Sequence, residues 1–334
     1  MYILGIESSC DETAAAIVTE DRTILSNIVY SQINEHEFFG GVVPEVAARS
    51  HLEKIDVVVN NALLDARLDI SDITAVAGTC GPGLIGGVIV GATFAKSISM
   101  AMNIPFIAAN HLEAHALSIR LTDDVDFPYL LLLASGGHCQ LCVVYSINHF
   151  EVIGKTIDDS IGESFDKVAK LLGWEYPGGP IIEKMSIHGN DRSFLLPHPL
   201  CSKDSCDFSF SGLKTAVRLA ATKCQTERDK IDLCASFQRA VTDVLVYKIN
   251  QAIKVCKTVK LSAVVISGGV AANKFIRIAL QNACEPYGLR FLAPPVHLCT
   301  DNGVMIAWLG VEKFLAGQFN DLNFSPMPRW PLSS

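Results

Sequence analysis

The chain has 334 residues, of which 49% are hydrophobic and 19% are charged, and its formal net charge is −8 at pH 7. This composition excludes an intrinsically disordered chain, and the length suffices for two domains or one large one. The acidic balance argues against broad nonspecific nucleic-acid binding, but a local basic patch or a basic partner is compatible with it.

The first third of the chain alternates apolar strands with helices. Strands are expected at 3–7, 14–19 and 23–31, with a polar turn between the first two that contains Asp11 and Glu12. Pro44 opens a helix to about residue 66, because proline fits the first helical turn. A buried strand at 73–79, a glycine turn at 80–83, a glycine-rich helix to about residue 102 and a strand near Phe106 follow.

The second half repeats this order. Strands at 129–134 and 139–145 enclose a glycine turn, and a strand at 263–267 leads through Gly268-Gly269 into a helix at 270–283. The doubled pattern is typical of the α/β actin-like, sugar-kinase-like nucleotide-binding fold, in which two lobes flank a cleft. We therefore predict an N-terminal lobe at 1–125 and a C-terminal lobe at 126–334, with a helical insertion at about 156–240.

Glycine turns in such a fold hold phosphates through backbone N–H groups. The turn Ser135-Gly136-Gly137-His138 allows a ligand to approach closely, because glycine has no side chain. Asn273 is either a surface helix residue or a hydrogen-bond partner for a ribose or base. Asp166 is either a solvated first-turn acid or an acceptor for ribose hydroxyls, and Glu183 taken alone favours a structural role.

A second group of candidates is the stretch Asn110-His111-Leu112-Glu113-Ala114-His115. Residues four apart share one face of a helix, so His111 and His115 can direct two imidazoles at one metal ion. The structural alternative is two partly exposed histidines at a helix start. Asp301 would complete a ligand set that suits iron or zinc, although it also fits the N-cap of the following helix.

A zinc-peptidase interpretation is weak. The H-E-x-x-H signature places glutamate directly after the first histidine, where this chain has Leu112. Glu113 lies about 200° around the helix from each histidine, which is unsuitable for a general base at a shared metal.

The eleven cysteines are odd in number and lack a framework spacing, which indicates a reducing, cytosolic environment. Cys139 and Cys142 lie on opposite faces of a predicted strand, so we interpret them as core residues. The N-terminus has the pattern of a strand and not of a signal peptide, and the apolar tract 84–95 is too short to span a bilayer. We therefore expect a cytoplasmic protein without membrane contact.

Ten stretches together resemble the tRNA N6-adenosine threonylcarbamoyltransferase family, bacterial type, once described as a sialoglycoprotein endopeptidase. They run in order over essentially the whole chain: Gly5–Thr13, Val43–Glu45, Gly81–Leu84, Asn110–His115, Ser135–His138, Gly162–Lys167, Pro177–Pro180, Phe208–Lys214, Ser267–Asn273 and Cys299–Gly303.

The resemblance implies roles for individual residues. His111, His115 and Asp301 would hold one divalent metal ion, either iron, which we favour, or zinc, and Asp11 and Glu12 are candidates for proton handling or orientation. The residues that would hold threonylcarbamoyl-adenylate are Ala134, Ser135, Gly136, Gly137, His138, Asp166, Gly179, Glu183 and Asn273.

The implied reaction transfers threonylcarbamoyl from that adenylate to the N6 amine of the adenosine just 3′ of the anticodon, in tRNAs reading codons that begin with adenine, and releases AMP. The implied partners are tRNA, a smaller paralogous subunit of the same fold and a P-loop ATPase. Alternatives are a small-molecule carbamoyltransferase that uses carbamoyl-adenylate and a non-catalytic nucleotide-binding subunit. For tRNA, the largest candidate basic cluster is Lys203, Lys214, Arg218, Lys223 and Lys230.

Overall fold

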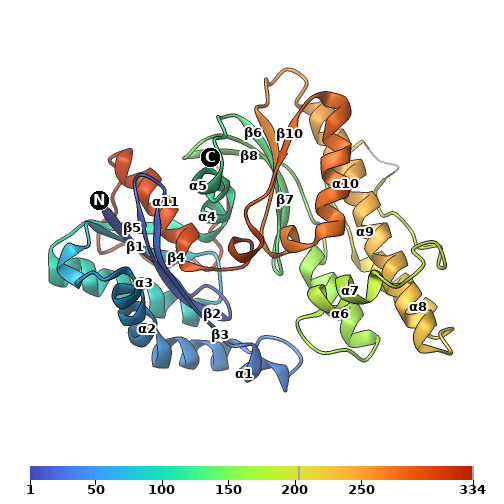
Figure 1. Ribbon diagram of the computed structural model, residues 1–334, viewed down its shortest axis with the longest axis horizontal. Helices are drawn as coiled ribbons and strands as arrows, with labels where there is room; N and C mark the ends of the chain where they lie inside the picture. The colour runs from blue at the N-terminus through green and yellow to red at the C-terminus, as the bar shows by residue number, and fades with distance from the viewer. Residues whose placement is uncertain (202–203, 333–334) are drawn as a thin grey trace. The chain divides into compact units, whose positions relative to one another are not determined.

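The computed structural model describes residues 1–201 and 204–332, which divide into two compact units. Of the described residues, the first unit comprises Met1–Asp124 and the C-terminal segment 300–332, and the second comprises Val125–Cys299. Each unit is built around its own five-stranded sheet (Figure 1).

The sheet of the first unit has the strand order β3-β2-β1-β4-β5. β1 pairs antiparallel with β2 and parallel with β4, β2 pairs antiparallel with β3, and β4 pairs parallel with β5. The carboxyl ends of β1, β3, β4 and β5 therefore share one edge of the sheet. The strands are β1 (Tyr2–Glu7), β2 (Glu12–Thr19), β3 (Ile24–Ser31), β4 (Ala75–Gly81) and β5 (Phe106–Asn110).

Helices cover both faces of this sheet. α2 packs on β2 and β3, α3 packs on β4 and α2, and α11 packs on β1, β2 and β4. Leu4 and Ile6 of β1 join Ile55 and Val58 of α2 in one core, as the two-residue period of a strand requires. The helices are α1 (Ile33–Glu37), α2 (Pro44–Ala66), η1 (Ile70–Asp72), α3 (Ile85–Met102), α4 (His111–Leu117), α5 (Ile119–Thr122) and α11 (Gly303–Leu315).

The C-terminal segment corrects the predicted domain division. The boundary expected after residue 125 agrees with the start of the second unit at Val125, but α11 belongs to the first unit and not to a C-terminal lobe that extends to 334. Small residues cause this close packing: a Cβ on Gly303 would lie 2.5 Å from the backbone of Ala15, and a Cβ on Gly5 would lie 2.5 Å from Gly303 O.

The sheet of the second unit has the order β10-β9-β6-β7-β8. β6 pairs antiparallel with β7 and parallel with β9, β7 pairs antiparallel with β8, and β9 pairs parallel with β10. This pairing repeats the first sheet strand for strand, so the duplication that the sequence pattern predicts is present. The strands are β6 (Tyr129–Ala134), β7 (Cys139–Ser146), β8 (His149–Lys155), β9 (Ala263–Ser267) and β10 (Arg290–Leu292).

The stretch 156–240, predicted as a helical insertion, holds α6, α7, α8 and the first half of α9. The helix predicted at 270–283 is divided, because a 3₁₀ turn precedes Asn273 and the α-helix begins only at Lys274. The helices of this unit are α6 (Ile161–Leu171), α7 (Gly178–Ser186), α8 (Ser211–Ala221), α9 (Glu227–Val255), η2 (Gly269–Ala272), α10 (Lys274–Cys284), η3 (Glu285–Tyr287) and η4 (Val296–Leu298).

Among the helices of the described residues, α3 alone is long and apolar enough to cross a membrane, with a mean hydropathy of 1.5. It also packs against β4 and α2. A single helix of this kind is equally typical of a core helix in a globular protein.

The close packing of α11 on β1 makes a stability prediction. Gly5→Ala places a Cβ against the backbone of Gly303 and Ala307, so we expect a loss of about 1–3 kcal/mol in the free energy of unfolding. The control is Gly212→Ala on α8, where a Cβ meets nothing within 4 Å and where alanine favours the helix. Denaturant unfolding of both variants measures the difference, and equal stability would contradict the packing argument.

Candidate functional site

The first candidate site lies where β5 ends and α4 begins. Asn110 caps α4, since its Oδ1 accepts hydrogen bonds from Leu112 N (2.8 Å) and Glu113 N (3.3 Å). The helix that starts there places the rings of His111 and His115 on one face, with ring centroids 4.7 Å apart. Both histidines are buried, so the interpretation as two partly exposed histidines is wrong.

Asp301 approaches both histidines from the loop before α11. Its Oδ1 lies 3.0 Å from His115 Nε2 and 3.6 Å from His111 Nε2. One ligand atom from each of the three residues falls within 4.8 Å of the others. Asn302, and not Asp301, caps α11, because its Oδ1 accepts from Met305 N at 2.9 Å. The structural alternative for Asp301 is therefore removed.

Glu7 contacts the Nδ1 side of the His111 ring. The sequence analysis did not identify Glu7 as a site residue. Its Oε2 lies 3.2 Å from His111 Nδ1 and accepts a hydrogen bond from Thr79 Oγ1 at 2.7 Å, while its Oε1 accepts from Ser9 N at 2.5 Å. Glu7 is fully buried at the end of β1. A glutamate that closes an otherwise apolar strand was the available signal.

The electrostatics of this site favour a cation. Burial alone would lower the pKa of His111, but the Asp301 and Glu7 carboxylates outweigh it and raise the pKa to about 9. Burial also acts to raise the pKa of Glu7, yet the neighbouring His111 holds it below its usual value. A protonated His111 thus supplies positive charge that the carboxylates require.

Asp11 and Glu12 bring two further carboxyl groups to the same edge of the sheet. Asp11 is buried, and Glu12 is half-buried at the start of β2. Burial, followed by the charges of Asp301, Asp11 and Glu7, raises the pKa of Glu12 well above its usual value. Two imidazoles and an acid, in a buried region with surplus carboxylates, form a donor set that fits one divalent metal ion.

The second candidate site lies on the second unit, at the turn after β6. Ser135 N donates to His138 O at 2.8 Å, and His138 N donates to Ser135 Oγ at 3.2 Å, which closes the turn. A Cβ on Gly136 or Gly137 would meet no atom within 4 Å. These two glycines therefore border open space that a ligand can occupy.

Two other glycines allow neighbouring segments to pack closely against this turn. A Cβ on Gly162, at the start of α6, would lie 2.8 Å from Gly136 Cα, and one on Gly268 would collide with Ala134 O. Gly268 also has a φ of +93°, which favours glycine. The turns after β6 and β9 and the N-terminus of α6 consequently lie side by side.

Polar side chains join the neighbouring helix starts. Asp166 Oδ1 accepts from Gly178 N at 2.7 Å, and Glu183 Oε1 accepts from Lys274 N at 2.7 Å. Asn273 caps α10 by accepting from Ile276 N (3.0 Å). These contacts position the starts of α7 and α10 near the glycine turn, and Gly179 borders open space.

Asn273 is buried, so its interpretation as a surface helix residue is wrong. Its Nδ2 donates to Gln238 Oε1 of α9 at 2.8 Å. Gln238 was not identified from the sequence, since nothing in the helical pattern of α9 distinguishes it.

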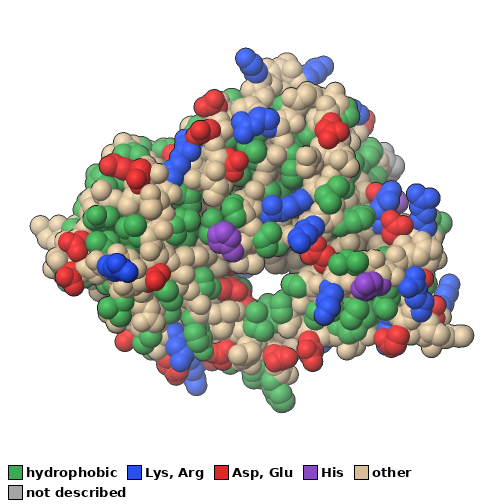
Figure 2. All heavy atoms as spheres, in the orientation of Figure 1, with side chains coloured by type: hydrophobic (Ala, Val, Ile, Leu, Met, Phe, Trp, Pro, Cys, Tyr) green, Lys and Arg blue, Asp and Glu red, His purple; other side chains and the backbone are tan. Residues whose placement is uncertain are grey.

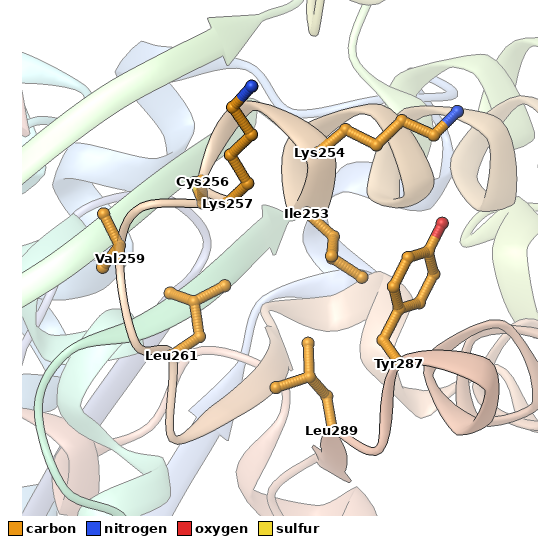
Figure 3. A pocket seen from close by; sticks show the side chains of 8 residues that line it. All are labelled: Ile253, Lys254, Cys256, Lys257, Val259, Leu261, Tyr287 and Leu289. Carbon is orange, nitrogen blue, oxygen red and sulfur yellow. The ribbon is translucent and has the colours of Figure 1, made fainter.

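A separate apolar pocket of about 360 Å³ lies between the end of α9 and η3 (Figure 3). Its lining residues are Ile253, Lys254, Cys256, Lys257, Val259, Leu261, Tyr287 and Leu289. None of them belongs to either candidate site.

Comparisons with known proteins identify the family. The sequence profile of the family described as tRNA N6-adenosine threonylcarbamoyltransferase matches residues 23–308. A Brucella canis protein of that name is 54% identical over 342 residues, covering 99% of this chain and 95% of the relative. The Brucella ovis protein of the same name has the same identity and coverage. The resemblance drawn from the sequence motifs is confirmed, and neither alternative function is favoured.

Solved structures confirm the fold. The HypF protein from T. kodakarensis aligns with a TM-score of 0.63 and 14% identity, over 95% of this chain and 48% of that one. Component A of (R)-2-hydroxyglutaryl-CoA dehydratase from Acidaminococcus fermentans aligns with a TM-score of 0.56 and 17% identity, over 95% of this chain and 99% of that one. At such identities the likeness shows the actin-like, sugar-kinase-like fold alone.

The shifted pKa of His111 predicts how metal binding depends on pH. A proton held with a pKa of about 9 competes with a metal ion for the ring, so apparent metal affinity should rise from pH 7 to pH 9. Glu7→Gln should flatten this rise and lower the affinity about 10- to 100-fold. Chelator competition across that pH range measures both effects.

The control is Glu113→Gln, which also alters a carboxylate on α4 but one that pairs with Lys313 at 2.7 Å. In metal-free protein the effect of pH on folding is the opposite, because a rising pH lowers the free energy of unfolding. The pKa of His111 rises from 6.5 to about 9 on folding, so its stabilisation is complete below 6.5 and is lost as the pH passes 9. A pH-independent metal affinity in wild type would contradict this account.

Proposed function

The chain belongs to the tRNA N6-adenosine threonylcarbamoyltransferase family, and from this premise we propose that its first unit holds a catalytic metal ion and its second unit the acyl donor. The enzyme is an acyltransferase that modifies adenosine in tRNA. The proposed acceptor is the adenosine directly 3′ of the anticodon, and the proposed donor is threonylcarbamoyl-adenylate, with AMP as the leaving group.

The observation that carries the metal proposal is the convergence of His111, His115 and Asp301 in a buried, carboxylate-rich region. We favour iron over zinc as the ion. When bound, it would act as a Lewis acid toward a carbonyl oxygen, which matters because the aromatic amine of adenosine is a poor nucleophile. Glu7 holds Nδ1 of His111 and so leaves Nε2 directed toward Asp301.

Asp11 and Glu12 are the proposed groups for proton handling. Burial and the surrounding carboxylates raise the pKa of Glu12 well above its usual value. A carboxylate with a raised pKa is a suitable acceptor for the proton that leaves the attacking amine. Asp11 is fixed through its backbone, whose carbonyl accepts from Gln32 N at 2.9 Å.

The donor proposal rests on the open glycine turn at Gly136 and Gly137 and on the helix starts beside it. Peptide N–H groups of the glycine turn would bind the phosphate of the adenylate. Asp166 is the proposed acceptor for ribose hydroxyls, while Glu183 and Asn273 position the backbone around the ligand.

Two lysines of the basic cluster proposed to bind tRNA pair with acids of this unit. Lys214 pairs with Asp159 at 3.0 Å and Lys230 with Glu227 at 2.6 Å, and Lys203 lies outside the described residues. Arg218 and Lys223 remain as candidate phosphate contacts on and after α8. On the face of this unit that Figure 2 shows, Lys and Arg side chains lie among Asp and Glu side chains.

A smaller paralogous subunit and a P-loop ATPase are the proposed partners in the cytoplasm. Support for a protein partner comes from α2 and α3, which pack together and expose large apolar side chains. These include Leu52, Val57 and Leu64 on α2 and Ile85, Ile89 and Met100 on α3. Burial of this surface by a helical partner would also account for the hydropathy of α3.

Replacement of the metal ligands tests the first proposal. His111→Ala or His115→Ala should abolish most bound metal and most of the modified nucleoside, because each removes one of three ligands. His149→Ala is the control, since that histidine is exposed on β8. Elemental analysis gives metal content, and mass spectrometry of tRNA nucleosides after incubation with threonine, bicarbonate, ATP and the partner proteins gives transfer. Full metal content in both ligand variants would place the metal elsewhere.

Two substitutions at Asp166 test the donor site. Asp166→Ala should weaken adenylate binding by about 1.5–3 kcal/mol, the range for a hydrogen bond to a charged group. Asp166→Asn retains an oxygen that can accept from Gly178 N but loses the charge. If the carboxylate contacts the ligand, both variants bind less tightly in calorimetry.

Wild-type affinity in Asp166→Asn would restrict Asp166 to holding Gly178. Asp232→Ala serves as the control, because Asp232 accepts from Asn190 N at 2.8 Å in the same unit but is not among the proposed donor residues.

A further inference from the structure

Two adjacent phenylalanines project from the segment that follows β3. The side chain of Phe38 is 92% exposed and that of Phe39 is 52% exposed. Their ring centroids are 5.5 Å apart, and their planes meet at 86°. Gly40 and Gly41 follow with φ values of +65° and +156°, so the chain turns sharply behind the rings. We call Phe38 and Phe39 the aromatic pair.

The segment that carries the aromatic pair begins at the same edge of the sheet as the proposed metal site. β3 pairs antiparallel with β2, which pairs antiparallel with β1, so β3 and β1 point the same way. Gln32 and α1 at the end of β3 consequently emerge at the same edge as Glu7 at the end of β1.

A buried hydrogen-bond chain fixes the base of this segment. Gln32 and His36 have no exposed surface. Val43 N donates to His36 Nδ1 at 3.3 Å, so the other nitrogen of that ring, Nε2, carries the proton and donates to Gln32 Oε1 at 3.1 Å. The backbone before and after the aromatic pair is thereby joined through one histidine.

The same series of hydrogen bonds continues to the turn that carries Asp11 and Glu12. Gln32 N donates to Asp11 O at 2.9 Å, and the side-chain amide of Gln32 lies 3.4 Å from His51 Nδ1. His51 Nδ1 also lies 2.7 Å from Thr13 Oγ1, and its Nε2 lies 3.0 Å from Cys10 O. Burial lowers the pKa of His51, which matches a neutral ring in this arrangement. The aromatic pair is therefore held at a set position relative to the turn at Asp11.

We propose that the aromatic pair is a stacking platform for an unpaired base in the tRNA loop that contains the target adenosine. This inference rests on tRNA as the substrate and not on the proposed metal or donor residues. Unpaired loop bases expose their faces, and proteins commonly recognise them by stacking on aromatic side chains. Stacking needs no basic surface, so it suits a chain with a net charge of −8. Glu35 and Glu37 of α1 disfavour a phosphate contact beside the pair, because carboxylates and phosphates repel each other.

Substitution by residues of different shape separates stacking from simple apolar contact. The double variants Phe38→Ala with Phe39→Ala, and Phe38→Leu with Phe39→Leu, should raise the KM for tRNA roughly 5- to 100-fold and leave kcat and donor affinity unchanged. Phe38→Tyr with Phe39→Tyr should restore the wild-type KM. Phe319→Ala is the matched control, because Phe319 is a 49% exposed phenylalanine in the same unit.

Photo-crosslinking tests the contact directly. A variant of the chain with a photo-crosslinking amino acid at position 38 is mixed with unmodified tRNA and the partner proteins and then irradiated. Mass spectrometry should map the crosslink to the loop that contains the target adenosine, and position 319 should give none. A crosslink to a protein partner, or a leucine double variant with wild-type KM, would overturn the proposal. Loss of transfer through failure of the metal or donor site would instead lower kcat or donor affinity, so the two failures are distinguishable.

Discussion

The close packing of α11 against β1 and β2 is the contact on which the proposed metal site depends. Gly5, Ala15 and Gly303 leave no room for larger side chains there, so the helix backbone rests almost directly on the sheet. The loop before α11 is thereby brought to the edge where β5 ends. Asp301 reaches the two histidines for this reason, although 186 positions separate it from His115. A larger residue at this contact would displace a ligand as well as destabilise the core.

Buried charge is the second constraint on this edge of the sheet. Glu7, Asp11, Glu12 and Asp301 bring several carboxylates to a region with little solvent, and a proton on His111 compensates only part of their charge. Such an arrangement costs folding free energy unless a cation completes it. The same surplus of carboxylates that disfavours the metal-free state favours a divalent ion. The proposed metal site would thus couple stability to function through one set of side chains.

The two units apply the same sheet topology to different chemistry. In the first unit, the edge beyond the carboxyl ends of the strands carries imidazoles and carboxylates from β1, α4 and the loop before α11. In the second unit, the corresponding turns after β6 and β9 carry glycines, two of which, Gly136 and Gly137, border open space. The first arrangement suits the proposed metal ion, and the second leaves room for the phosphate of the proposed acyl-adenylate.

The sequence by itself determined the fold class, the doubled strand order, the glycine turns and the shared face of His111 and His115. All of these follow from local periodicity or from residues a few positions apart, which backbone geometry alone relates. The tertiary structure decided that α11 belongs to the first unit, that Glu7 supports His111, that Gln238 holds Asn273, and that Gln32, His36 and His51 join the aromatic pair to the turn at Asp11. Each of these contacts depends on which strands are neighbours and how helices pack on them. Hydrophobic patterning specifies that an element is buried, but only the packed sheet fixes which distant side chain it meets.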